Sequence, residues 1–242
     1  MRTLIFSDIH ANLTALEAVL SDAGKTDQIW CLGDLVGYGP DPNECVTLIQ
    51  SLPSLTCILG NHDAAAIGLL DTVSFNQDAK VSASWTTNNL TPSNIQFIKT
   101  LKPMVVKNNI TLAHGSPRNP IWEYILDSYT AKINLENMKT RICFVGHTHL
   151  SSIFIYNEKS QSVDLRPLKN NEKFKLTQKT ILNPGSLGQP RDNDPRAAYA
   201  ILDTATGIFE THRVPYDIPS VQQRIIDAGL PERHAMRLTQ GW

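Results

Sequence analysis

Residues 3–10 read TLIFSDIH, a short apolar run that ends in a carboxylate and an imidazole. The run Thr3–Phe6 is apolar and β-prone, so it predicts a strand, and Asp8 and His10 follow it closely. Two side chains two positions apart on an extended segment face the same side, so Asp8 and His10 are expected to point into one region. Both side chains can bind a metal ion, and the end of this strand is therefore a candidate metal site.

Four later strand candidates end in the same way. The apolar sequences IWCL, LTCIL, ITLA and ICFV each lead into polar groups able to bind a metal, and these groups are Asp34, Asn61, His114, His147 and His149. In α/β sheets ligands bind outside the carboxyl ends of the strands, so strands lying side by side would bring all five tips to one crevice. Of the seven histidines only His212 and His234 lie away from these tips, and they are assigned no function.

The predicted ligands are oxygen and imidazole groups without a thiolate. This excludes a cysteine zinc knuckle and suits manganese, iron or zinc. Seven candidates are too many for one tetrahedral ion, so two ions sharing a carboxylate is the economical arrangement. The cysteines form no CxxC pair, and they are expected to be small buried thiols; they are Cys31, Cys45, Cys57 and Cys143.

Composition excludes several classes of protein. The chain has 242 residues, of which 41% are hydrophobic and 19% charged, so it is too apolar for a disordered protein. Its net charge of −1 gives no basic excess that would recommend a stable nucleic-acid partner. No stretch is long and apolar enough to span a membrane. The apolar run before Asp8 is too short for a signal peptide, so a cytoplasmic location is expected.

The order of strand and helix signals predicts one α/β domain over residues 1–242. Strands and helices alternate through the first 150 residues, and a helical stripe over Leu13–Ala23 is the clearest case. Antiparallel signals follow, including a hairpin from Ala197–Asp203 and Ile208–Val214. A helical tail covers about residues 218–240, with a break at Gly229-Leu230-Pro231. The prediction is therefore a mixed sheet or two packed sheets.

The polar blocks together resemble a known family. DIH, GDLVGYG, GNHD, HGS and GHTH, in this order and spacing, resemble the five blocks of the calcineurin-like metallophosphoesterase superfamily over roughly residues 4–150. The later segment NPGSLGQPR resembles that of its small bacterial and archaeal phosphodiesterase branch. The resemblance implies a four-layer α/β/β/α sandwich, two mixed sheets flanked by helices, and a metal-dependent phosphoric ester hydrolase.

The resemblance also implies a role for each residue. Asp34 would bridge two metal ions, and manganese is the favoured metal. A hydroxide between the ions would attack phosphorus in line, and His62 would protonate the departing alkoxide. Asn61, beside His62, is predicted to be both a ligand and part of the catalytic pair. One ion would be held by Asp8, His10 and His149, and the other by Asn61, His114 and His147.

One block departs from the pattern of the family's protein phosphatases, which carry GDxVDRG. Here Gly37 and Tyr38 follow Val36, so the aspartate that orients the histidine and the arginine that grips phosphate are both missing. This puts protein phosphatase activity in doubt and leaves open whether Asp63 or a backbone carbonyl supports His62. Two other arginines, Arg118 and Arg191, are candidates for binding a substrate phosphate, with a solvated surface position as the alternative for each.

The function that these residues favour is hydrolysis of small phosphorylated substrates, as a phosphodiesterase or phosphatase of small nucleotides. A dinucleoside tetraphosphate hydrolase is the alternative within the same chemistry. A non-catalytic scaffold, resembling the retromer subunit with this fold, is the alternative from another class. It is disfavoured because every ligand position and His62 are filled. The sequence decides neither the native metal nor the oligomeric state.

Overall fold

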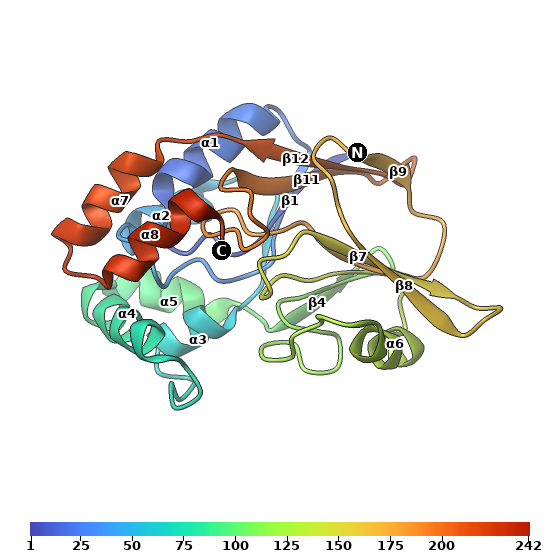
Figure 1. Cartoon of the computed structure of the whole chain (residues 1–242), viewed down its shortest axis with the longest axis horizontal. Helices are drawn as coiled ribbons and strands as arrows, with labels where there is room; N and C mark the ends of the chain where they lie inside the picture. Colours follow the sequence, from blue (N-terminus) through green and yellow to red (C-terminus); the bar gives the residue numbers. More distant parts are fainter.

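The computed structural model describes residues 1–242, and strands and helices alternate in its first part (Figure 1). The first part comprises β1 (Arg2–Phe6), α1 (Leu13–Ala23), β2 (Gln28–Cys31), α2 (Pro42–Ser51), β3 (Leu55–Cys57), α3 (Asn61–Ala66), α4 (Gln77–Asn89), α5 (Pro92–Thr100), β4 (Met104–Lys107), β5 (Ile110–Ala113), α6 (Ser128–Asn137) and β6 (Ile142–Phe144). The second part comprises β7 (Ser152–Asn157), β8 (Ser162–Pro167), β9 (Lys173–Lys175), β10 (Thr180–Asn183), β11 (Ala197–Asp203), β12 (Ile208–Val214), α7 (Ile218–Asp227) and α8 (Glu232–Gln240).

The strands form two six-stranded mixed sheets, in the orders β3-β2-β1-β11-β12-β9 and β4-β5-β6-β10-β7-β8. Strands β1, β2 and β3 are parallel in the first sheet, and β5, β6 and β10 are parallel in the second. The five strands with polar tips therefore do not lie side by side in one sheet. Their carboxyl ends meet because the two sheets pack face to face.

Three apolar clusters define four layers, which confirms the predicted α/β/β/α sandwich. Strand β1 shows why, since its side chains alternate between the two faces of the sheet. Leu4 and Phe6 pack with the helices on the outer face, whereas Ile5 packs with Phe144 of the opposite sheet. A third cluster covers the outer face of the second sheet with α6. The four cysteines are free, and all except Cys57 are buried.

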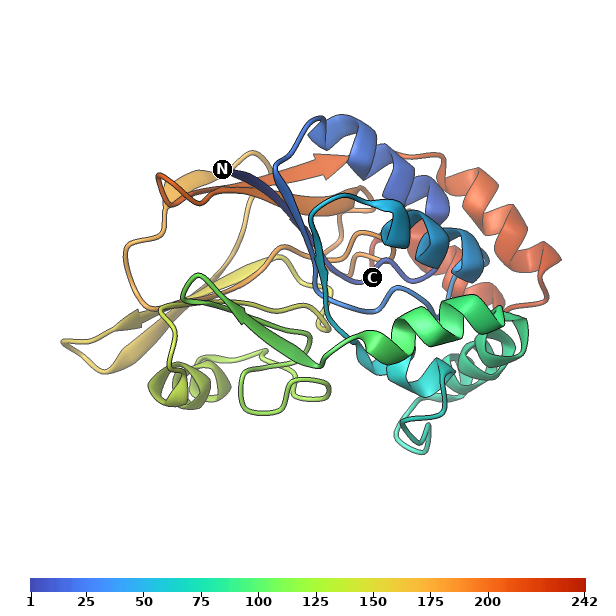
Figure 2. The same cartoon turned by 180° about the vertical axis from the view of Figure 1, so that it is seen from behind.

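The C-terminal helices pack together and dock on the first part of the chain, beside α1, α2 and α4 (Figure 2). Their shared core includes Val221, Ile225 and Leu238, with Trp85 of α4 packed against it. Arg224 of α7 pairs with Asp41 at the start of α2, with 3.0 Å between its Nη2 and Oδ2. No helix is long and apolar enough to cross a membrane.

Candidate metal centre

All seven predicted metal ligands meet at the ends of the parallel strands and are no more than 3% exposed. Asp8 and His10 follow β1, Asp34 follows β2, Asn61 opens α3, and the remaining three follow β5 and β6. Burial of so many polar side chains is unfavourable unless they have partners. Their convergence therefore needs a ligand or a complete hydrogen-bond network.

The backbone at the site is left-handed rather than extended. Five of the seven predicted ligands have positive φ, and these are Asp8 (57°), His10 (49°), Asp34 (55°), His147 (65°) and His149 (61°). Non-glycine residues adopt this conformation at a cost of roughly 1–3 kcal/mol each, mostly at functional sites. The prediction that residue pairs two apart converge is confirmed for Asp8 and His10, but its reasoning from an extended segment is wrong. Tight left-handed turns bring these side chains together.

One group comprises Asp8, His10 and His149. The Nε2 atoms of the two histidines lie 3.0 Å apart, and Asp8 Oδ1 lies 3.5 Å from His149 Nε2. The Nδ1 atoms of both rings face backbone carbonyls, at 3.1 Å from Val36 O and 2.6 Å from Gln189 O. A carbonyl only accepts, so each Nδ1 carries the proton and each Nε2 presents a lone pair. Two lone pairs and a carboxylate at these distances fit a cation between them.

A second group comprises Asp34, His114 and His147. His114 Nε2 lies 3.2 Å from Asp34 Oδ2 and 3.0 Å from Asn61 Oδ1, while its Nδ1 donates to Leu32 O at 2.8 Å. Asp34 Oδ2 also lies 3.6 Å from His10 Nε2, so this carboxylate stands between the two groups. Asp34 Oδ2 and His147 Nε2 are buried with no hydrogen-bond partner. Unpartnered acceptors in a buried site fit a metal ion.

Burial favours the neutral form of three of the four imidazoles among the predicted ligands. Burial lowers the pKa of His147 to about 3, and it holds the pKa values of His10 and His149 well below their usual range. Burial also opposes protonation of His114, but the charge of Asp34 outweighs it and raises the pKa of that ring to about 10. The carboxylates around His114 thus attract positive charge, which a bound metal cation would supply. Neutral imidazole and ionised carboxylate are the forms that bind metals.

His62 lies beside the cluster without a carboxylate to orient its ring. Its ring packs against Tyr38 at 4.4 Å, Phe75 at 4.7 Å and His10 at 5.0 Å between centroids. Its Nδ1 is buried without a partner, and a Cβ added at Gly37 would lie 2.6 Å from that atom. Because Gly37 also has a φ of 91°, this position suits glycine and leaves no room for an orienting side chain. Packing between aromatic rings therefore orients His62.

Asp63 does not contact the ring of His62. Its carboxylate instead accepts the backbone N–H groups of Asp34 and Leu35 at 2.8 Å, Gly60 at 3.1 Å and Val36 at 3.2 Å. The GNHD block thus holds the loop that carries Asp34. Sequence reasoning named Asp63 only as a possible support for His62 and missed this role.

The two arginine candidates have different surroundings. The guanidinium of Arg191 lies 5.9 Å from the centre of the Tyr38 ring, and its backbone N–H donates to His149 O at 3.2 Å. Arg191 therefore lies at the rim of the cluster. The Arg118 side chain is 48% exposed and its guanidinium pairs with Glu123, so it makes no contact with the cluster. A role for Arg118 in substrate binding stays a prediction.

Several supporting residues were not predicted. In the NPGSLGQPR segment, Asn183 Nδ2 donates to Gly146 O at 2.7 Å, and Ser186 Oγ donates to Asp8 O at 2.9 Å. This segment therefore braces two of the metal-site loops. Tyr124 stacks on His147 at 3.8 Å and is 46% exposed. The resemblance of NPGSLGQPR to a branch of the family was the only sequence signal for this segment. No pattern in the sequence marked Tyr124.

Comparison with known proteins identifies the family. The Calcineurin-like phosphoesterase superfamily domain matches residues 1–207. The chain belongs to this superfamily. The crystal structure of a metallophosphoesterase from Sphaerobacter thermophilus superposes on this calcineurin-like chain with a TM-score of 0.92 and 44% identity, covering 100% of this chain and 99% of that one. The chain is therefore a phosphoric ester hydrolase, and the family it belongs to is metal-dependent.

Two sequence relatives extend the comparison. The uncharacterized protein MJ0912 of Methanocaldococcus jannaschii is 37% identical over 98% of this chain and 97% of its own length. A symmetrical bis(5'-nucleosyl)-tetraphosphatase of Proteus mirabilis is 35% identical over 81 residues, which are 32% of this chain and 30% of that protein. The full-length likeness thus supports the calcineurin-like fold and family, whereas the tetraphosphatase likeness covers only a segment.

Proposed function

We propose that this calcineurin-like phosphoesterase binds two metal ions and hydrolyses small phosphorylated substrates as a phosphodiesterase or phosphatase of small nucleotides. The observation that carries the proposal is the arrangement of acceptors in the cluster. Imidazole lone pairs, the Asn61 carbonyl oxygen and two carboxylates face one another, and Asp34 Oδ2 is buried without a partner. Cations are the groups that such an arrangement lacks.

Each group of side chains has a proposed ion. Asp34 would serve both, because its Oδ2 lies between His10 Nε2 and His114 Nε2. Bound ions would attract phosphoryl oxygens and lower the pKa of a water enough to make it a nucleophile. Manganese is the favoured metal, with iron or zinc as the alternatives. One ion would be held by Asp8, His10 and His149, and the other by Asn61, His114 and His147.

His62 is proposed to protonate the leaving group. Burial lowers its pKa to about 4, so the ring is neutral before substrate binds. A phosphate bound beside it would add negative charge and favour the protonated ring. Its backbone N–H donates to Asp34 Oδ1 at 2.9 Å, which ties its position to the proposed bridging ligand. The imidazolium can then give its proton to the departing oxygen.

A dinucleoside tetraphosphate hydrolase is the second candidate. The segment likeness to the Proteus mirabilis tetraphosphatase supports it, together with the free positive charge of Arg191 at the rim. Both candidates concern small substrates. The block GDLVGYG lacks the arginine of the protein phosphatases, so a phosphoprotein has less to hold it.

A substrate screen with defined metals tests the proposal. Purified protein is treated with a chelator, loaded with Mn, Mg, Zn or Fe, and assayed on bis(p-nitrophenyl) phosphate, diadenosine tetraphosphate and a phosphopeptide. We expect hydrolysis only with metal, and a higher kcat/KM for the diester or the tetraphosphate than for the phosphopeptide. A clear preference for the phosphopeptide would contradict the proposed substrate class. Absence of turnover with every metal would contradict the proposed chemistry.

A further inference from the structure

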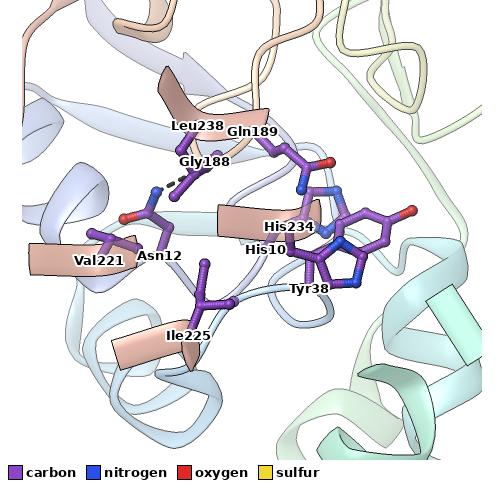
Figure 3. A pocket seen from close by; sticks show the side chains of 10 residues that line it. His10, Asn12, Tyr38, Gly188, Gln189, Val221, Ile225, His234 and Leu238 are labelled. Atoms are coloured by element: carbon purple, nitrogen blue, oxygen red, sulfur yellow. Dashed lines mark hydrogen bonds between the residues drawn. The ribbon is translucent and has the colours of Figure 1, made fainter. Parts of the chain in front are cut away.

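Helix α8 lies beyond residues 1–207, the part of the chain that matches the superfamily, yet it reaches the rim of the candidate metal centre. Its His234 packs on Tyr38 at 4.8 Å, and Tyr38 packs on His10 at 4.6 Å. A cavity of about 10 Å³, room for roughly one water, lies among these rings and Leu238 (Figure 3). The C-terminal helix is therefore part of the wall of the site.

The same helix brings a second arginine to this rim. Arg237 lies three residues after His234 on α8, and Arg191 lies over Tyr38. Residues three apart on a helix lie on the same face, so Arg237 stands beside His234, whose ring packs on Tyr38. Two arginines from segments far apart in the sequence thus lie around Tyr38, which borders the candidate metal centre.

Neither guanidinium has an anionic partner. No carboxylate lies within ion-pair distance of Arg191 or Arg237, and the Nε atoms of both are buried without a hydrogen-bond partner. The guanidinium of Arg191 donates to Gln189 Oε1 at 3.2 Å, and that of Arg237 faces the ring of Trp242 at 5.6 Å. Burial and then the charge of Arg191 lower the pKa of Arg237. Partly buried like charges without a counter-ion destabilise the ligand-free protein.

We propose that Arg191 and Arg237 form a second anion subsite, which binds a phosphate group of the substrate other than the one that is hydrolysed. The inference rests on the proposed function, because it places this subsite beside the metal centre. Guanidinium groups bind phosphate oxygens with paired N–H donors, so two of them fit one phosphate. The substrate class is therefore a compound with at least two phosphate groups, such as a nucleoside polyphosphate.

Inhibition by inorganic anions tests the subsite. Manganese-loaded protein hydrolyses p-nitrophenyl phosphate at fixed free metal, and the inhibition constants of inorganic phosphate and pyrophosphate are measured. We expect pyrophosphate to bind more tightly than phosphate in the wild type. In Arg237→Gln this preference should fall about tenfold, the size expected for a charged hydrogen bond. Arg237→Lys should keep part of it.

The matched control is Arg233→Gln, which removes an exposed arginine of the same helix that also faces Trp242. It should leave the preference unchanged. An unchanged preference in Arg237→Gln, or an equal loss in Arg233→Gln, would overturn the inference.

Thermal unfolding gives a readout that needs no turnover. Pyrophosphate should raise the Tm of the wild type more than that of Arg237→Gln. Without ligand the Tm of the variant should be equal or higher, because a partly buried charge without a counter-ion is removed. A lower ligand-free Tm together with an unchanged pyrophosphate shift would make Arg237 a structural residue and overturn the subsite. If p-nitrophenyl phosphate is not hydrolysed with any metal, the proposed function fails while this arm still tests the subsite.

Discussion

Three imidazole rings of the cluster are oriented by the ring nitrogen that points away from the cluster. His10, His114 and His149 each donate from Nδ1 to a backbone carbonyl, which fixes the tautomer and aims Nε2 into the site. Such contacts raise the basicity of the ligand atom and restrict the ring. His147 has no such carbonyl partner and is instead held by stacking on Tyr124. At this scale the site is organised by backbone carbonyls and aromatic contacts.

The role of His62 gives the first prediction. His62→Ala should keep both metal ions but lose about 10²–10⁴-fold in kcat, the range for a positioned acid. The loss should be smaller for p-nitrophenyl phosphate, because its leaving group needs little protonation. A ring nitrogen of His62 lies within 4.8 Å of possible ligand atoms of His10 and Asp34, so a role as a metal ligand is the competing hypothesis. Loss of metal from the variant, measured by elemental analysis, would favour that hypothesis.

Asp63 gives the second prediction. Replacing it with alanine leaves the N–H groups of Asp34, Leu35, Val36 and Gly60 without their carboxylate. We expect Asp63→Ala to lower the free energy of unfolding by roughly 3 kcal/mol, measured by urea denaturation.

The exposed Asp164→Ala serves as the control for Asp63→Ala and should change the free energy of unfolding by less than about 0.5 kcal/mol. Equal stability of the two variants would show that Asp63 does not hold the loop.

Elements with a strong local pattern could be predicted from the sequence, whereas two edge strands could not. The predicted bounds of Leu13–Ala23, Ala197–Asp203 and Ile208–Val214 coincide with α1, β11 and β12, because a helical stripe marks the first and the pattern of a hairpin marks the other two. Strands β4 and β9 were missed. They lie at sheet edges, and β9 is a strand because it pairs with distant β12 rather than because of its lysine-rich sequence.

The docking of α8 buries the imidazole of His234, so the stability of the protein should depend on pH. His234 is 1% exposed, and burial lowers its pKa from the usual 6.5 to about 4. The unfolded chain therefore binds a proton at His234 more readily than the folded chain does. The contribution of the neutral His234 ring to the free energy of unfolding is thus complete above pH 6.5. It falls by up to about 3 kcal/mol as the pH drops towards 4.

Urea denaturation at several pH values checks this prediction. His234→Gln should show a shallower loss of stability between pH 6.5 and 4 than the wild type. His212→Gln, which removes a more exposed imidazole, should change the slope less. Identical pH slopes for wild type and His234→Gln would contradict a buried neutral ring at this position.

Across the whole molecule, all seven predicted ligands come together because each follows a predicted strand and the two sheets pack face to face. The residues that sequence reasoning missed owe their positions to contacts between distant segments. Ser186 braces Asp8 across the two sheets, and α8 carries His234 and Arg237 back to the first loops. Local patterns contain no signal for such contacts. The sequence therefore predicted which polar residues come together, but not the contacts between distant segments that surround them.

The number of metal ions bound per chain decides whether the metal centre is dinuclear. Protein loaded with manganese and freed of excess metal is analysed for metal and protein content, beside Asp34→Asn and the exposed control Asp164→Asn. We predict two ions per chain in the wild type and the control. Asp34→Asn should lower the occupancy of both sites, because its carboxylate lies between the two groups. A wild-type content that never exceeds one ion per chain would contradict a dinuclear centre.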